Sequence, residues 1–252
     1  NHEFCGGQFE INLTHSAALD AADRSFRMKS AIQEIARHSG MLATFMAKPI
    51  ADYAGSGMHF HVSLMDGAGR NVFAEAPGKG WTPTLLHALG GLRETMAESM
   101  LIFAPHLNSW RRFANQSYAP VSTSWGVNNR SVALRVPAGD VRARRIEHRP
   151  SGVDANPYLV AATVLAAIRH GLKHKIDPGA ETTGNGYAAD IPEDVIPRDW
   201  RSAIAAAKKS AFLKEALGPD LHRTFTAIKE AEYLRVARTI ADVDYQLYLH
   251  EV

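Results

Sequence analysis

The sequence contains a single cysteine, Cys5, in 252 residues. One cysteine excludes a disulfide framework and any zinc site made of several cysteines, and it fits the reducing cytoplasm, where we expect the protein to lie. Long apolar runs are missing too. The longest nearly apolar run covers residues 159–168, about half of what a bilayer crossing needs, so we expect no membrane-spanning segment.

An excess of charge of either sign is also missing. The 28 lysine and arginine residues face 26 aspartate and glutamate residues, a formal net charge of +2. This balance argues against a nucleic-acid or membrane-surface partner. Hydrophobic residues make up 46% and charged residues 21% of the chain, which excludes disorder and predicts one large or two small domains. No initiating methionine or signal segment precedes Asn1, so we expect residues upstream of it.

The spacing of apolar residues predicts an α+β domain. Alternation indicates strands at 9–13, 58–64, 130–136 and 144–149, and spacing by three and four indicates helices at 16–37, 83–104 and about 157–175. Residues 177–197 are predicted to be an exposed loop, and 200–252 two or three helices broken at Gly218 and Pro219. We expect an antiparallel or mixed sheet with flanking helices.

Arginines are concentrated in one part of the chain. Residues 111–149 contain eight arginines, no lysine and only two acids, Asp140 and Glu147. Guanidinium groups are used where planar, two-pronged contact with phosphate or carboxylate matters. A solvated basic face or a nucleic-acid site fits less well, because lysine is absent and aromatic residues are few. We interpret the cluster as a site for a small polyanionic ligand such as a nucleotide.

Two histidines share one face of the predicted strand 58–64. His59, His61 and Ser63 alternate with apolar residues that face the core. This pattern favours a metal ligand beside a group that contacts phosphate, although structural histidines with this spacing are common. The preceding Gly55 and Gly57 would let the backbone approach a ligand.

Two carboxylates near the start flank a Gly-Gly pair. Glu3 and Glu10 would face oppositely on an unbroken strand, but the glycines permit a turn that brings both to one site. With His59 and Glu147 they would make a mostly oxygen-donor ligand set, which favours Mg²⁺ or Mn²⁺ over Zn²⁺.

Several ordered blocks resemble the catalytic domain of the glutamine synthetase family, from Glu3 to about Lys175. The matching blocks are GQFE at 7–10, KP at 48–49, GSGMHFH at 55–61, NSWRR at 108–112, NRS at 129–131, RVP at 135–137, ARRIEHR at 143–149 and ANPYL at 155–159. The resemblance implies a fold like that of glutamine synthetases and guanidino kinases over residues 1–252, with 177–252 as a variable loop and helical C-terminal part.

The resemblance also implies roles for the matching residues. Glu3 and Glu10 match ligands of a first metal ion; His59 and Glu147 match ligands of a second, which bridges the phosphates of ATP. The implied contacts to ATP are His61, Ser63, Arg130, Arg135 and Arg142. The implied contacts to glutamate and the amine are Gly55, Arg112, Tyr118 and Arg149. The residues implied to lie at the transferred phosphate, as catalytic residues, are His61, Arg130 and Arg149.

The implied reaction joins glutamate to an amine at the expense of ATP, through γ-glutamyl phosphate. In ammonia-using members a glutamate stands before an Ala-Pro pair, where this chain has Tyr118. A phenol has neither the charge nor the basicity of a carboxylate at neutral pH. The chain therefore resembles the γ-glutamyl-polyamine synthetase-like branch, and glutamine synthetase proper, using ammonia, is the alternative.

Other hypotheses stay open beside this one: a catalytically silent scaffold with the same fold, a guanidino-kinase-like enzyme and a zinc hydrolase. The presence of His59, Arg112 and Glu147 argues against the scaffold. The resemblance further implies an N-terminal β-grasp domain that this sequence lacks, and a full-length homo-oligomer, a dodecamer of two stacked rings. Replacing Glu147 by alanine is expected to abolish phosphoryl transfer with little loss of stability.

Overall fold

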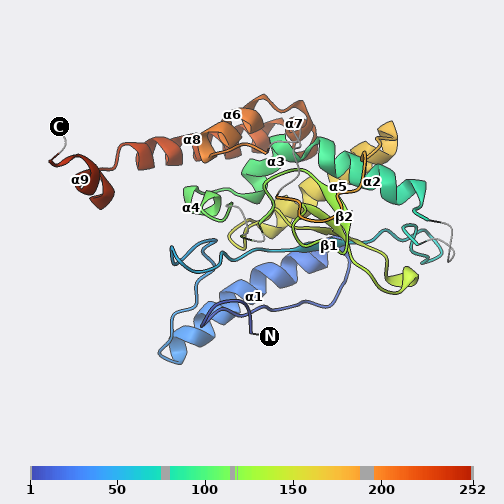
Figure 1. The fold of residues 1–252 in the computed structure, drawn as a ribbon, viewed down its shortest axis with the longest axis horizontal. Coiled ribbons are helices and arrows are strands. Elements are labelled where there is room, and N and C mark those ends of the chain that lie inside the picture. The colour runs from blue at the N-terminus through green and yellow to red at the C-terminus, as the bar shows by residue number, and fades with distance from the viewer. Residues whose placement is uncertain (1, 75–79, 114–116, 118, 188–195, 251–252) are drawn as a thin grey trace.

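A four-stranded mixed sheet lies at the centre of the molecule. The computed structural model describes residues 2–74, 80–113, 117, 119–187 and 196–250 (Figure 1). The strands are β1 (Phe60–Val62), β2 (Trp125–Val127), β3 (Leu134–Val136) and β4 (Ile146–His148), in the order β1-β4-β3-β2. β4 is antiparallel to β1 and β3, and β2 is parallel to β3. The predicted α+β class with a mixed sheet is confirmed.

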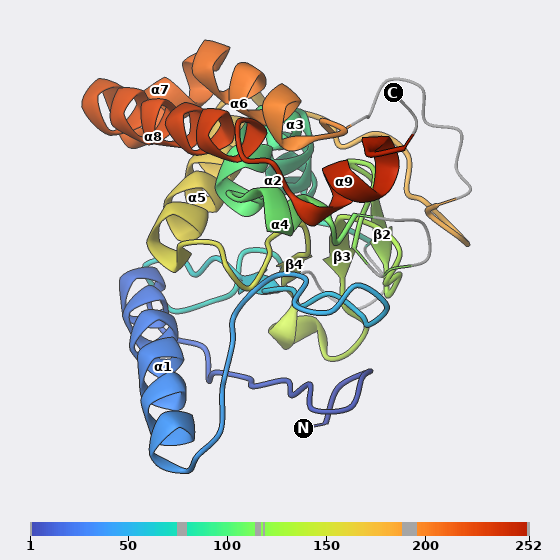
Figure 2. The ribbon, with the colours of Figure 1, turned by 90° about the vertical axis from the view of Figure 1, so that its left-hand side faces the viewer.

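Helices flank the sheet. They are α1 (Ala18–His38), α2 (Pro83–Glu94), α3 (Met96–Phe103), α4 (Leu107–Trp110), α5 (Pro157–His174), α6 (Trp200–Lys209), α7 (Ala211–Leu217), α8 (Pro219–Ala237) and α9 (Asp242–Tyr248), with a 3₁₀ turn at Val141–Ala143. Both views place α1 at one end of the molecule, α6, α7 and α8 at the other, and α5 between them (Figures 1 and 2). None of the described helices combines the length and apolar character that a bilayer crossing requires.

The core lies between one face of the sheet and helices α2, α3 and α5. Val62, Leu134 and Ile146 come from three adjacent strands and belong to one buried cluster with residues of these helices. Helices α2 and α5 approach closely where Gly91 meets Gly171, because a Cβ on Gly171 would stand 2.0 Å from a backbone oxygen of α2. The apolar stripe predicted for 83–104 is therefore the buried face of these helices.

The predicted element boundaries need several corrections. The strand expected at 9–13 is wrong: Phe9 forms an isolated bridge with His2, and residues 10–17 have no strand structure. The helix expected at 83–104 is broken at Thr95, whose hydroxyl donates back to the carbonyl of Gly91. Strand β2 was not predicted, since three residues around Gly126 carry no readable alternation. The described tail contains four helices rather than two or three.

The segment expected as an exposed loop at 177–197 is partly buried. Of its described residues, Pro178, Gly186 and Ile196 are buried; 188–195 lie outside the described part of the chain. The backbone N–H of Thr182 donates to the carbonyl of Trp125, and the carboxylate of Glu181 accepts from the N–H of β2 at Val127. The segment therefore satisfies the outer edge of the sheet, which would otherwise expose unpaired backbone groups.

Candidate active site

A row of three polar side chains crosses the sheet. The strand register pairs His61 of β1 with Glu147 of β4, and Glu147 with Arg135 of β3. Because successive side chains alternate between faces, the row lies on the face opposite the apolar core. His59 and Arg149, each two positions from a member of the row, belong to the same face. The alternation predicted for 58–64 and 144–149 thus builds one polar surface from three strands.

Glu147 lies at the centre of this surface. Its side chain is only 2% exposed, and one oxygen accepts a hydrogen bond of 2.7 Å from Arg135 Nη1. The other oxygen accepts from Arg149 Nη1 and lies 3.5 Å from Nδ1 of His59. Burial favours the neutral acid, but the surrounding positive charges, that of Arg149 first, outweigh it and lower the pKa of Glu147. The carboxylate is therefore ionised and held from two sides.

The two histidines of this surface are neutral near pH 7. Burial lowers the pKa of His59 and His61, and the adjacent positive charges, Arg149 beside His59 and Arg145 beside His61, lower it further. Arg145 Nε donates to Nδ1 of His61 over 3.1 Å. This bond leaves the imidazole proton of His61 on Nε2, so that nitrogen is a hydrogen-bond donor.

Arg112 is a buried cation beside this surface. Its residue is 4% exposed, and Nη1 donates to the carbonyl oxygen of Pro150 over 3.1 Å. Two glycines make room for it: a Cβ on Gly55 would stand 2.6 Å from its Cγ, and one on Gly57 would stand 2.8 Å from Nη2. Burial, partly offset by Asp154, lowers the pKa of Arg112 to about 10, which leaves it charged at neutral pH.

No carboxylate in the described part of the chain lies within ion-pair distance of Arg112. A buried guanidinium with a carbonyl partner and no carboxylate within ion-pair distance can accept a carboxylate from a ligand.

The N-terminal turn docks beside the same glycines. The turn at residues 5–8 forms as the Gly-Gly pair predicts, closed by a hydrogen bond from Gln8 N to Cys5 O. The Gln8 side-chain amide donates to Gly55 O over 3.2 Å and to Ser56 Oγ over 3.1 Å, and the thiol of Cys5 accepts from Ala54 N. Gln8 thereby joins the start of the chain to the segment that makes room for Arg112.

The four predicted metal ligands do not gather in the described structure. Among the described residues no group of three or more His, Cys, Asp or Glu side chains is placed to hold a metal ion. His59 and Glu147 are neighbours, whereas Glu3 and Glu10 are exposed residues of the N-terminal segment. The pairing within that segment joins His2 to Phe9 and leaves both glutamates outside the sheet.

The remaining predicted site residues lie outside the paired strands, with Ser63 directly after β1 on the same face as the row. Arg142 is exposed and pairs with Asp140 over 3.1 Å in the turn before β4. Arg130 and Ser63 are exposed as well. Tyr118, the residue on which the predicted choice of amine rests, lies outside the described residues.

Two contacts of the site were missed by sequence reasoning. Arg145 was counted among the eight arginines without a role, and its alternation with Glu147 was the available signal. Tyr187 lies in the segment expected as a loop; its hydroxyl donates to Ala119 O over 3.2 Å, and its phenol lies near enough to Arg112 and Arg149 to act on the pKa of both. No sequence pattern placed that segment beside the arginines.

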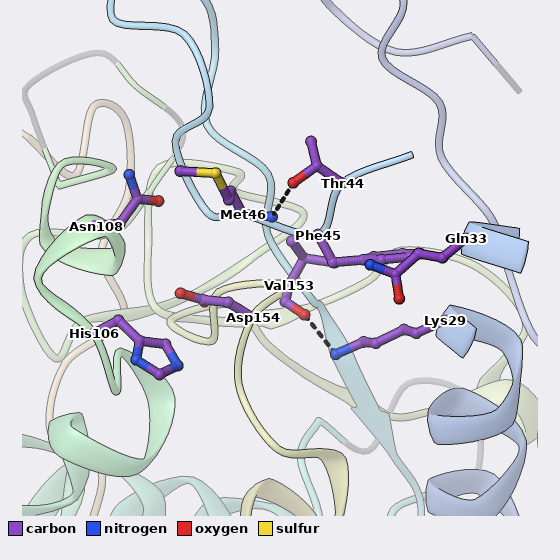
Figure 3. A pocket seen from close by; sticks show the side chains of 9 residues that line it. All are labelled: Lys29, Gln33, Thr44, Phe45, Met46, His106, Asn108, Val153 and Asp154. Carbon is purple, nitrogen blue, oxygen red and sulfur yellow. Dashed lines mark hydrogen bonds between the residues drawn. The ribbon is translucent and has the colours of Figure 1, made fainter. Parts of the chain in front are cut away.

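A separate pocket of about 420 Å³ opens between α1 and the segments before α4 and α5 (Figure 3). The ammonium group of Lys29 donates there to the carbonyls of Val153 and Ala155. Asn108 exchanges hydrogen bonds with the backbone of Lys48. Lys29 therefore fastens α1 to the segment before α5, and Asn108 fastens the loop at 44–48 to α4, so the pocket is a junction between elements.

Proteins of one family resemble this chain over nearly its whole length. The family model described as "Glutamine synthetase, catalytic domain" matches residues 1–248. The chain is 39% identical over 246 residues to the gamma-glutamylputrescine synthetase PuuA of Escherichia coli (strain K12), covering 96% of this chain and 51% of that protein. It is 36% identical over 239 residues to a glutamine synthetase of Pyrococcus horikoshii, covering 92% and 53%.

A solved structure described as a GmaS/ADP complex superposes with a TM-score of 0.84 at 29% identity, covering 93% of this chain and 55% of that one. The chain thus spans about half the length of the curated relatives it matches. The matched region contains the whole polar row and Arg112. The chain belongs to the glutamine synthetase family, through its catalytic domain.

Proposed function

We propose that the complete protein is an ATP-dependent ligase that joins the γ-carboxylate of glutamate to an amine, and that it prefers an organic amine to ammonium. The observation that carries the proposal is the buried Arg112, without a carboxylate partner in the described structure, beside the row His61, Glu147 and Arg135. The guanidinium of Arg112 suits a carboxylate substrate, and the row suits a phosphoryl group. A relative named for putrescine supports the choice of an organic amine.

The pair His59 and Glu147 fits one divalent metal ion. The imidazole is neutral and the carboxylate ionised, which are the ligating forms of both groups. A nitrogen and an oxygen donor 3.5 Å apart suit Mg²⁺ or Mn²⁺ together with phosphate oxygens. When bound there, the ion would add positive charge against the phosphates of ATP. Glu3 and Glu10 remain proposed ligands of a second ion.

In the first step the γ-carboxylate oxygen of glutamate attacks the γ-phosphorus of ATP. A phosphorus–oxygen bond forms, the bond from the γ-phosphorus to the oxygen that bridges the β- and γ-phosphates breaks, and ADP leaves with the electron pair of that bond. Arg112 would hold the α-carboxylate of glutamate in its fork. Arg135, Arg149 and the Nε2–H of His61 would donate to the phosphoryl oxygens, where preorganised donors are most effective.

In the second step the amine nitrogen attacks the acyl carbon of γ-glutamyl phosphate, and inorganic phosphate leaves. The amine nitrogen attacks in its unprotonated form, and the proton that it loses as the amide forms goes to the departing phosphate. In ammonia-using relatives a glutamate at the position of Tyr118 would help, and the phenol does not supply that charge at neutral pH. An amine with an organic substituent could instead gain affinity by packing against the ring.

We also propose a homo-oligomer, as the family resemblance implies. Helix α1 buries only Ala22 among its residues, while Leu19, Phe26 and Ile35 are exposed. The C-terminal helices and the segment between them expose Ile228, Ile240 and Tyr245 in the same way. Exposed apolar residues of this number are typical of faces that another protein surface covers. Size-exclusion chromatography of the complete protein with light scattering tests this, and a monomer at micromolar concentration would contradict it.

The reaction itself is tested by phosphate release from ATP by the complete protein with glutamate and Mg²⁺ or Mn²⁺. Ammonium is compared with a panel of mono-, di- and polyamines. We expect turnover with putrescine or another organic amine to exceed turnover with ammonium. Turnover with ammonium alone would make the protein a glutamine synthetase proper. Silence with every amine would overturn the ligase assignment.

A further inference from the structure

Asn128 has an unusual backbone conformation immediately beside the polar row. Its φ is +48°, and Asn128 and Lys175 are the two described residues other than glycine with positive φ. This left-handed region costs energy for residues with a Cβ, and asparagine tolerates it better than most. Such strain persists where the surroundings hold it, and it is found most often at functional sites.

Hydrogen bonds from both sides hold this conformation. Asn128 follows β2 directly, and its backbone N–H donates to Val136 O of the parallel strand β3 over 2.9 Å. The next residue, Asn129, donates from its amide to the carbonyls of Thr182 and Gly184 and accepts from Ser131 N. The chain thus turns sharply after β2, and the turn directs the Asn128 side chain toward β3.

The Asn128 amide holds one end of a site arginine. Arg135 Nη2 donates to Asn128 Oδ1 over 2.6 Å, while Nη1 of the same guanidinium donates to Glu147 Oε2 over 2.7 Å. Both hydrogen bonds involve a charged group and are short, which is the strong class. The fork of Arg135 is therefore fixed between an amide on the turn and a carboxylate on β4.

We propose that Asn128 is a positioning residue that holds Arg135 in the orientation needed for phosphoryl transfer. The inference rests on the proposed function, because Arg135 is assigned there to the phosphoryl oxygens. A preorganised donor stabilises developing charge without reorganisation during the reaction. Asn128 itself touches Arg135 and not the substrate, so it acts through that guanidinium.

The test uses Asn128→Gly and Arg135→Ala, singly and together, in the complete protein. Asn128→Gly removes the acceptor and relieves the strain, so kcat/KM for ATP should fall about tenfold without a lower Tm and with the KM for glutamate unchanged. In the Arg135→Ala background the same change should have no further effect, because the residue it positions is gone. Independent, multiplying losses in the double variant would overturn the proposal.

Two further variants separate positioning from relief of strain. Asn128→Asp keeps an oxygen acceptor and tolerates positive φ, and should stay within about threefold of the wild type. A loss as large as that of the glycine variant would contradict the proposal. Lys175→Gly relieves the other left-handed residue, at the end of α5, and should leave kcat/KM unchanged.

A crystal structure of Asn128→Gly tests the positioning of Arg135 without any measurement of the reaction. The inference expects Arg135 to leave Glu147 or to adopt several conformers in that variant. An unchanged hydrogen bond between Arg135 and Glu147 would overturn it. If the wild-type protein ligates no amine, the proposed function fails, while this structural comparison still tests whether Asn128 positions Arg135.

Discussion

The two faces of strands β1, β4 and β3 have opposite chemistry although they alternate residue by residue. On one face His61, Glu147 and Arg135 form the polar row, and on the other Val62, Ile146 and Leu134 are buried in the core. A shift of one position along a strand therefore exchanges an ionic environment for an apolar one. Activity therefore depends on one residue of a strand and stability on the next, so substitutions at neighbouring positions should affect one property without the other.

The largest effect is expected at the centre of the polar face. Glu147→Gln keeps the volume of the side chain but removes the charge that Arg135 and Arg149 share, and kcat should fall about a thousandfold, equivalent to about 4 kcal/mol. Steady-state phosphate release measures this. Glu215→Gln, at an exposed pair with Arg169, is the matched control. A kcat of Glu147→Gln within tenfold of the wild type would show that activity does not depend on the charge at the centre of this face.

The structure changes the stability that we expect of the alanine variant at the same position. The sequence alone suggested that Glu147→Ala would cost little stability. In the structure this carboxylate neutralises two arginines, of which Arg149 is itself buried. Removing one partner of a buried ion pair leaves uncompensated charge. We therefore expect Glu147→Ala to lower Tm in the metal-free protein as well as abolish activity.

The next position on β4 should show the reverse behaviour. Ile146 is fully buried on the apolar face, so Ile146→Ala should lower the free energy of unfolding by about 3 kcal/mol. At temperatures where the variant stays folded, its kcat should remain within about twofold of the wild type. Urea unfolding and kinetics on the same sample test both statements. Leu42→Ala, at a residue 94% exposed, serves as the control, with an expected change of less than about 0.5 kcal/mol.

A smaller and more specific effect is expected at the buried cation. Arg112→Lys keeps the charge but loses the planar fork, so the KM for glutamate should rise about tenfold while the KM for ATP changes little. The adjacent exposed Arg111 provides the control variant Arg111→Lys. An unaltered KM for glutamate would remove Arg112 from the substrate site.

The smallest effect is expected at the glycine that makes room for this cation. A Cβ at Gly57 would meet Arg112 Nη2 at 2.8 Å, and the end of a flexible side chain moves at little cost to the fold. Gly57→Ala should raise the KM for glutamate about threefold with an unchanged Tm. Gly67→Ala, where a Cβ would meet nothing within 4 Å, should change neither. A fall in Tm for Gly57→Ala alone would assign this glycine to stability.

Much of the fold could be predicted from the sequence because the patterns that indicate strands and helices are local. Alternation at 58–64 and 144–149 predicted β1 and β4 and the face of each side chain, and spacing by three and four predicted α5 from about residue 157. The strand expected at 9–13 failed for the opposite reason. Its alternation is real, but no strand of the described chain pairs with it, and a strand exists only with a partner.

The residues of the site could be predicted from the sequence to a similar degree. The residue types that suit phosphate and carboxylate were evident from the arginine cluster, and the two histidines from their spacing. The sequence could not show that Arg142 pairs with its neighbour Asp140 while Arg135 reaches across to Glu147. That distinction depends on strand register, which joins residues far apart in the chain.

The sequence by itself determined the chemistry of this protein: the donor types, the alternation that divides them between two faces, and the resemblance to one family. Only the tertiary structure decided which of these groups meet. It brought Arg112 against Gly55 and Gly57, left Glu3 and Glu10 apart from His59, and held Arg135 on Asn128. The physical reason is that side-chain periodicity is a property of one strand, whereas register and close approach arise only when separate segments pack together.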